Sequence, residues 1–248
     1  LLFMDNVDSF DLIRLEYYII EQNRKICEVS DDEPDNKWCR QLLHRFLCCM
    51  KRYLRADFID GYDAYDRQRK YICISDPKAE NYEKFWELAW CREVNTIVKI
   101  SQREEESCQY WSSREGSEIE CGGFRIKTLI VIKRPRFIST LLLLSDQKNR
   151  KREILHYHYT ASPTNNNSDE PFIFLSFVCS LNDTYTTSKK EQSAEWKLGT
   201  VLVHCNDGSS FSAVYCVLDM CVTQFKYTGT ISVANAYRKI KQREHNCL

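Results

Sequence analysis

Residues 200–225 read TVLVHCNDGSSFSAVYCVLDMCVTQF, and this stretch decides the fold. Val201–Val203 is an unbroken apolar run, which is typical of a strand buried on both faces. The polar residues 206–210 favour a tight loop, and apolar residues at helical spacing follow from Phe211, namely Ala213, Val214, Val217, Leu218 and Val222. The stretch therefore predicts a buried strand, a tight loop and a buried helix.

Cys205 lies at the end of the predicted strand, where a reactive side chain would be well placed. In a strand, loop and helix of this kind, the N–H groups of the loop and the N-terminus of the helix converge on one point and favour an anion there. The same field favours a thiolate over a thiol. We therefore expect Cys205 at the floor of an anion-binding cradle.

The stretch resembles the HCxxGxxR[S/T] loop of the protein tyrosine phosphatases, in which the cysteine attacks phosphotyrosine and the arginine holds the phosphate. The corresponding residues here are His204, Cys205, Asn206, Asp207, Gly208, Ser209, Ser210, Phe211 and Ser212. Phe211 stands at the arginine position and offers no hydrogen-bond donors, while Asp207 adds a carboxylate to a cradle that holds a dianion in the family. The resemblance implies a phosphatase scaffold with a degenerate active site.

A second departure from the family follows residues 154–160, ILHYHYT, which resemble the family's HFHYT. The next family residues are AWPD, a loop whose aspartate protonates the leaving tyrosine. Here the tryptophan is replaced by Ser162, Pro163 is kept, and the aspartate is replaced by Thr164, which cannot donate a proton at a useful pKa. His156 and His158 fall on one strand face and could begin a metal site, but without a recognisable third ligand we favour a structural role.

Other segments resemble the family in the family's order, from about Lys51 to the end of the chain. Lys51-Arg52-Tyr53 resembles KNRY, whose tyrosine walls the phosphotyrosine pocket, so Tyr53 is a weak candidate for substrate binding. Relative to the family, we expect the chain to be shortened after Tyr53 and again at the C-terminus. Three further anchors are Ser75-Asp76-Pro77 for QGP, Phe85-Trp86 for the FW of DFW..VW, and Cys108–Trp111 for C..YW. This spacing and ending most resemble the phosphatase-related proteins of parasitoid-wasp bracoviruses.

The resemblance implies one α/β domain over residues 1–248, in which helices flank a central, strongly twisted mixed sheet. We expect N-terminal helices in 1–50 and the phosphatase-like core in 51–248. Strands are expected at Lys70–Ile74 and Thr96–Ile100, and an antiparallel pair at Phe124–Ile132 and Arg136–Leu144. A helix should begin at Pro171 with Phe172, Leu175, Phe177 and Val178, a polar linker should cover Asn182–Lys197, and a last helix should contain Ile231, Val233, Ala234, Tyr237 and Ile240.

Composition excludes several classes of partner. Lys plus Arg and Asp plus Glu number 35 each, so no global field favours nucleic acid or a membrane surface. No apolar run approaches the roughly 20 residues of a membrane span. The 13 cysteines are odd in number and lack CxxC pairs, which favours reduced thiols in a cytosolic or nuclear protein. We expect a cytoplasmic location, that of the host cell if the protein is viral.

The leading hypothesis is a pseudophosphatase that binds or sequesters signalling proteins, without cofactor or metal. If the bracovirus resemblance holds, these would be signalling proteins of an insect host. We expect weak or no phosphotyrosine binding, because Asp207 or a small anion can satisfy the loop donors. The alternative is an active phosphatase of altered specificity that works through Cys205. A thiol redox module is disfavoured, because no resolving cysteine is visible in sequence beside Cys205.

Overall fold

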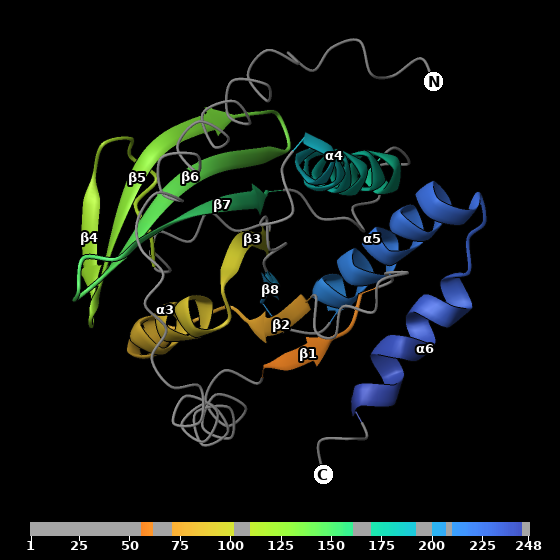
Figure 1. Ribbon diagram of the computed structural model, residues 1–248, viewed down its shortest axis with the longest axis horizontal. Coiled ribbons are helices and arrows are strands. Elements are labelled where there is room, and N and C mark those ends of the chain that lie inside the picture. The colour runs from red at the N-terminus through yellow and green to blue at the C-terminus, as the bar shows by residue number, and fades with distance from the viewer. Residues whose placement is uncertain are drawn as a thin grey trace. The chain divides into compact units, whose positions relative to one another are not determined.

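The strand that ends at Cys205, β8 (Thr200–Cys205), lies in the interior of one mixed sheet (Figure 1). It pairs in parallel with β2 (Tyr71–Ser75) on one side and with β3 (Val94–Ile100) on the other. The side chains of Val203 and Leu202 point to opposite faces and both are fully buried. The prediction of an inner strand buried on both faces is confirmed.

The computed structural model describes residues 56–61, 71–101, 110–160, 170–191, 200–206 and 210–244, with only the backbone described for 183–191, 210 and 241–244. All of these residues fall within one compact unit, Leu43–Leu248. The predicted N-terminal helices of residues 1–50 lie outside the described residues, and the single domain over 1–248 stays a prediction.

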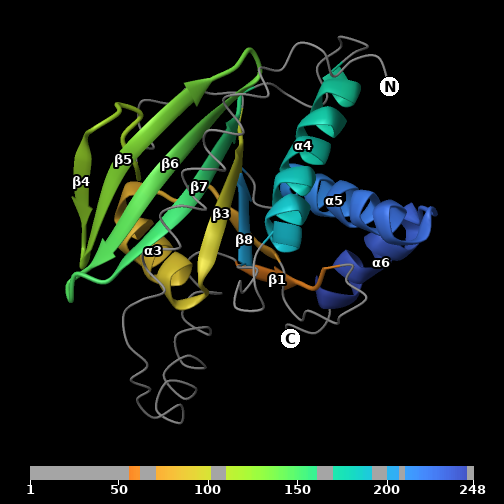
Figure 2. The same ribbon diagram turned by 45° about the horizontal axis from the view of Figure 1, so that its top comes forward.

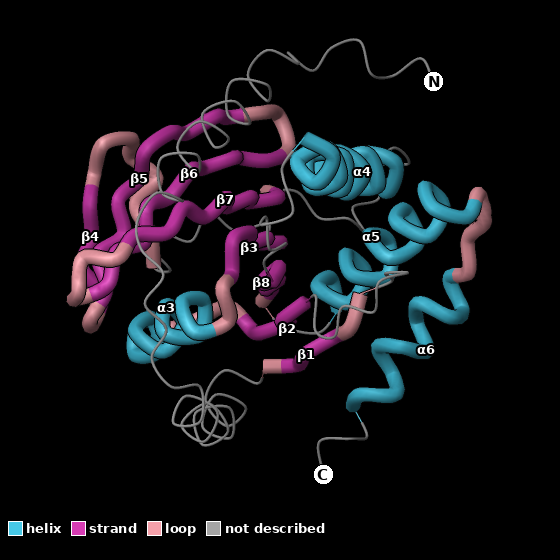
Figure 3. Tube along the Cα trace, in the orientation of Figure 1, coloured by secondary structure: helices cyan, strands magenta, loops and turns pink. Residues whose placement is uncertain are grey.

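The eight strands of the sheet follow the order β1-β2-β8-β3-β7-β6-β5-β4. The β2, β8, β3 and β7 strands run parallel, and the outer pairings are antiparallel. Figure 3 shows the strands of the sheet in magenta and the helices around it in cyan. The predicted antiparallel pair around Pro135 is confirmed by β5 and β6. The remaining strands are β1 (Asp57–Ile59), β4 (Glu118–Cys121), β5 (Phe124–Lys133), β6 (Phe137–Asp146) and β7 (Lys151–Tyr159).

Helices cover both faces of the sheet (Figure 2). On one face, α3 (Tyr82–Cys91), preceded by the short 3-10 helix η1 (Ala79–Asn81), buries Phe85, Trp86 and Leu88 in a cluster with the strands. On the other face, α4 (Glu170–Glu191), α5 (Ser210–Thr228) and α6 (Val233–Glu244) contribute to a second cluster. The arrangement is the predicted α/β fold, with the strand that carries Cys205 between two hydrophobic layers.

Helix α5 confirms the predicted helix, and Val217 and Leu218 of the apolar pattern pack against the core cluster, but the most buried side chains lie at other positions. Val214, which the apolar pattern placed on the buried face, is 43% exposed. The buried side chains are instead Ser212, Tyr215, Cys216, Asp219, Met220, Cys221 and Thr223. Polar contacts select this face, because Ser212 bonds to Cys205 and Asp219 accepts a hydrogen bond from Tyr71 of β2.

Helix α4 begins at Glu170 and continues to Glu191, so the polar linker predicted from Asn182 is wrong for residues 182–191. Asn182 is buried and donates hydrogen bonds to Asp219 and Thr223 of α5. These tertiary contacts hold residue 182 inside the helix although its side chain is polar. The predicted face is confirmed in part, since Phe177 and Val178 are buried, whereas Phe172 is 70% and Leu175 38% exposed. Phe174 and Leu181, which the prediction did not include, are buried as well.

The last helix, α6, begins at Val233, slightly later than the apolar pattern indicated. Ala236 is buried and Ile240 packs against the core cluster. Ile231, Val233 and Tyr237 are more than half exposed. Only part of the predicted apolar face of this helix is therefore buried against the described core.

Candidate functional site

Cys205 lies at the junction of β8 and α5, at the carboxyl ends of the parallel strands. The residue is 1% exposed, and its backbone carbonyl accepts a hydrogen bond of 2.9 Å from the N–H of Asp76, just after β2. The hydroxyl of Ser212, in the first turn of α5, donates to Cys205 Sγ over 3.1 Å. A strand and a helix therefore flank the predicted loop, and a hydroxyl of the helix contacts the sulfur atom.

The structure describes part of the predicted loop. His204, Cys205 and Asn206 are described on the strand side, with Asn206 exposed, and residues 210–212 on the helix side. Asp207, Gly208 and Ser209 lie outside the described residues, so the cradle of N–H groups and the role of Asp207 stay predictions. Tyr53 and the Ser162-Pro163-Thr164 segment also lie outside the described residues.

Phe211, at the family's arginine position, is part of α5. Its side chain is half-buried and packs against the hydrophobic cluster between the sheet and α4–α6. An arginine here could present several N–H donors to a phosphate, whereas the phenyl ring presents none. The position thus contributes to the packing of the core, and it carries no charge that could stabilise an anion.

His204 begins a chain of buried hydrogen bonds on the α3 face of the sheet. Its Nδ1 lies 2.5 Å from Asp76 Oδ1, and its Nε2 lies 2.6 Å from the hydroxyl of Tyr110. That hydroxyl also lies 2.7 Å from His156 Nε2. With the carboxylate of Asp76 as acceptor, Nδ1 of His204 carries a proton, Tyr110 donates to Nε2, and His156 donates to Tyr110. One consistent chain therefore links Asp76 to His156.

Burial lowers the pKa of His204 below its ordinary value, and the neighbouring Asp76 only partly offsets this effect. Burial would raise the pKa of Asp76, but the hydrogen bond that His204 donates to its carboxylate, together with nearby positive charge such as that of Lys99, outweighs it and leaves the pKa low. A fully buried His204 and a carboxylate that is only partly buried are most consistent with a neutral imidazole beside an ionised Asp76. The residue next to Cys205 thus supplies no cation.

Lys99 of β3 is a buried cation that the sequence analysis did not single out. It is 3% exposed, and the sheet register pairs it with His204 of β8 and His158 of β7. Its Nζ lies 5.2 Å from the centroid of the Trp111 ring. Burial, followed by the charge of Lys99, lowers the pKa of His158 to about 4. The sequence signal that could have identified Lys99 is a single lysine within the apolar run of the predicted strand Thr96–Ile100.

His156 and His158 are both buried, as the structural interpretation of this pair requires. His156 contacts Tyr110 as described above, and the ring of Trp111 lies against both histidines. Within the described ranges, no three His, Cys, Asp or Glu side chains gather in a way that could hold a metal ion. No helix in the described part of the chain is long and apolar enough to cross a membrane.

These features define a class of protein. A mixed α/β sheet places a cysteine after an inner parallel strand, and the next helix donates a hydroxyl to the cysteine sulfur. Residues 43–248 match the family described as Protein-tyrosine phosphatase, and the chain therefore belongs to that family.

Relatives of known name extend the match along most of the chain. The chain is 33% identical over 250 residues to "Probable tyrosine phosphatase protein J2" of Microplitis demolitor bracovirus (isolate Webb), a match that covers 93% of this chain and 82% of the relative. It is 34% identical over 205 residues to "Tyrosine phosphatase-like protein J3" of the same virus, covering 77% of this chain and 80% of that protein. The bracovirus resemblance inferred from the sequence is confirmed.

Proposed function

We propose that this chain is a catalytically inactive member of the family, and that it acts by binding or sequestering signalling proteins. The observation that carries the proposal is the packing of Phe211 against the core, at the position of the phosphate-binding arginine. The cradle then lacks its guanidinium fork, which is the strongest bidentate partner of a phosphate.

Magnitudes support a loss of turnover. An arginine that stabilises a transferred phosphoryl group contributes about 10³- to 10⁵-fold in rate. General acid catalysis contributes about 10²- to 10⁴-fold, and Thr164 replaces the residue that supplies it in the family. The two effects do not simply multiply, because catalytic groups act as a unit. Even either loss alone would leave little measurable activity.

The names of the relatives support a biological setting for the proposal. They belong to a bracovirus, so we extend the proposal to a viral protein that modulates immune signalling in the cytoplasm of insect host cells. Its partners would be host signalling proteins, bound without a cofactor and with little or no dependence on phosphotyrosine. The neutral His204 and the nearby carboxylate of Asp76 support weak anion binding, since neither attracts a phosphate.

An active phosphatase of altered specificity is the alternative. The contact of 3.1 Å between Ser212 Oγ and Cys205 Sγ favours it, because a hydroxyl donor stabilises a thiolate. The name "Probable tyrosine phosphatase protein" of a relative is also compatible with it. The two functions differ in whether Cys205 turns over a phosphate ester.

Hydrolysis of a small aryl phosphate decides between them. We expect the purified chain and its Cys205→Ser variant to release product at the same background rate, with a related active phosphatase as the positive control. A rate in the natural chain that disappears in Cys205→Ser would establish the alternative. Calorimetry with one peptide in phosphorylated and unphosphorylated form tests binding, and a clear preference for the phosphorylated form that free phosphate abolishes would contradict the expected weak recognition.

A further inference from the structure

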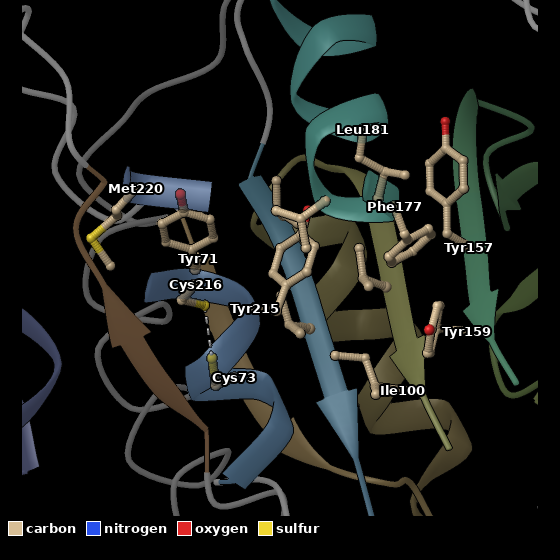
Figure 4. Close-up of a cluster of buried hydrophobic side chains, with 14 of the residues drawn as sticks. Tyr71, Cys73, Ile100, Tyr157, Tyr159, Phe177, Leu181, Tyr215, Cys216 and Met220 are labelled. Carbon is tan, nitrogen blue, oxygen red and sulfur yellow. Dashed lines mark hydrogen bonds between the residues drawn. The ribbon is translucent and has the colours of Figure 1, made fainter. Parts of the chain in front are cut away.

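A pair of thiols lies behind the Cys205 turn, between the sheet and α5. Cys73 Sγ of β2 and Cys216 Sγ of α5 are 3.6 Å apart, although 143 positions separate the two residues in the sequence. Figure 4 shows the two side chains pointing toward one another across the layer between the strand and the helix. Both residues are buried, with Cys73 3% and Cys216 0% exposed.

The pair borders the two elements that hold Cys205. Cys73 is paired with Val203 of β8, and two residues later Ser75 is paired with Cys205, so Cys73 and Cys205 lie on the same face of the sheet. On the helix, Cys216 follows Ser212 by four residues, about one turn, and Ser212 contacts Cys205. The thiol pair is therefore stacked behind the nucleophile position, one helical turn deeper.

The geometry is close to that of a disulfide. A disulfide needs sulfur atoms about 2.05 Å apart, so the sulfur atoms must approach each other by roughly 1.5 Å. Rotation about the Cα–Cβ bonds and small shifts of α5 can supply a displacement of that size. Both thiols already belong to ordered elements, and the oxidised pair would need no rearrangement of the sheet.

We propose that Cys73 and Cys216 are an oxidation site that forms an intramolecular disulfide with a small hydroperoxide as the oxidant. In the first step, one thiolate attacks the peroxide, an S–O bond forms, the O–O bond breaks, and water or an alcohol leaves. In the second step, the other thiolate attacks the sulfenic sulfur, the S–S bond forms, and the hydroxyl leaves as water with a proton. The cysteines lose two electrons and the peroxide gains them.

The cross-link would tie β2 to α5, the elements that flank Cys205 on two sides. Because it closes a loop of 142 residues between positions 73 and 216, it should stabilise the folded chain mainly by restricting the unfolded one. This role does not depend on whether Cys205 is catalytic, so it can be tested independently of the proposed function.

Peptide mapping tests the proposal on the full chain. The reduced protein is treated with hydrogen peroxide, alkylated in denaturant, digested without reductant and analysed by mass spectrometry. We expect one cross-linked peptide pair that contains Cys73 and Cys216, two hydrogen masses lighter than the separate peptides, which dithiothreitol separates. Recovery of both cysteines in alkylated form after treatment with peroxide, or pairing of either one with another cysteine, would overturn the proposal.

Variants give a second readout. In the natural chain, oxidation should raise the Tm, on the order of 10–20 °C for a loop of this length. Cys73→Ala and Cys216→Ala should each lose that increase, whereas Cys221→Ala, which removes a buried thiol from the same helix, should keep it. Cys205→Ser should also keep it. An increase that depends on Cys205, or that survives Cys73→Ala, would contradict a direct disulfide between the pair.

Discussion

The hydroxyl of Ser212 donates a hydrogen bond of 3.1 Å to the sulfur of Cys205, whereas Phe211, one residue earlier, packs against the hydrophobic cluster and offers no hydrogen-bond donor. The site therefore keeps the group that can stabilise a thiolate but lacks the group that holds the phosphate. Turnover of a phosphate ester and reactivity of the Cys205 thiol are separate properties, and each can be measured without the other.

Removal of the Ser212 hydroxyl should make Cys205 less reactive. In Ser212→Ala, the thiolate loses a donor worth about 0.5–1.5 kcal/mol, so alkylation of Cys205 by iodoacetamide at neutral pH should slow roughly two- to tenfold. Mass spectrometry of the Cys205 peptide gives the rate. Ser176→Ala on α4, which removes a hydroxyl bonded to its own helix, is the matched control and should leave the rate unchanged. Equal rates in all three proteins would contradict a role for Ser212.

Much of the fold could be predicted from local pattern. The residues that form β8 are one continuous apolar run in the sequence. The two strand-forming segments around Pro135 are adjacent in the sequence and pair with each other as β5 and β6. The family's loop also located Cys205 and its helix. These predictions required only the positions of the apolar residues and of the turn residues in the sequence.

The buried face of α5 could not be predicted in the same way. The apolar pattern favoured Val214, but the side turned to the sheet contains Asp219, Ser212 and Thr223. The hydrogen-bond partners of Asp219 and Thr223, Tyr71 and Asn182, lie far away in sequence. A hydrophobic pattern assigns polar residues to solvent unless their partners are known, and for the same reason it missed Lys99 and the last turns of α4.

Asn182 should be important for stability because it bridges two charged groups. It donates to Asp219 Oδ1 over 2.6 Å, and its own carbonyl oxygen accepts from Lys226 Nζ over 2.7 Å. Asn182→Ala should lower the free energy of unfolding by about 1–3 kcal/mol, because the buried carboxylate loses a donor. Urea unfolding measures it. Asn235→Ala, at an exposed position on α6, should cost much less, and equal losses would refute the bridge.

Buried histidines should make the chain sensitive to mild acid. The pKa of His158 is lowered to about 4 in the folded chain, whereas an unperturbed histidine has a pKa near 6.5. At pH values below about 6.5, His158 therefore binds a proton in the unfolded chain but not in the folded chain. Stability consequently falls as the pH decreases. Between pH 7.5 and 5.5 this residue alone should cost about 1 kcal/mol. Burial also lowers the pKa of His156 and of His204, which act in the same direction.

Glu153 acts in the opposite direction and must be separated from this effect. Burial raises the pKa of Glu153 to about 7, so between about pH 4.5 and 7 the folded chain holds a proton on Glu153 that the unfolded chain has released. The stability that this proton contributes is lost as the pH rises from about 4.5 through 7. The useful quantity is therefore the difference in unfolding free energy between the natural chain and His158→Gln at the two pH values. We expect His158→Gln to lose less stability than the natural chain on acidification. The same loss in both proteins would contradict the assignment to His158.

Phe211→Arg should restore anion binding in part, because it returns a guanidinium fork to the first turn of α5. Each charge-assisted hydrogen bond is worth about 1.5–3 kcal/mol, so binding of inorganic phosphate should tighten by roughly ten- to a hundredfold in calorimetry. The variant should also lose stability, about 1–2 kcal/mol, because the phenyl ring packs against the core.

Val214→Arg is the matched control, since it adds the same charge to an exposed position of the same helix. It should leave phosphate binding nearly unchanged. An equal gain in both variants would mean that phosphate responds only to net charge, and that the position of Phe211 carries no special geometry. Turnover of an aryl phosphate should require Thr164→Asp in addition to Phe211→Arg, because the arginine stabilises the phosphoryl group and the aspartate protonates the leaving group. Activity in Phe211→Arg alone would show that another residue already supplies that proton.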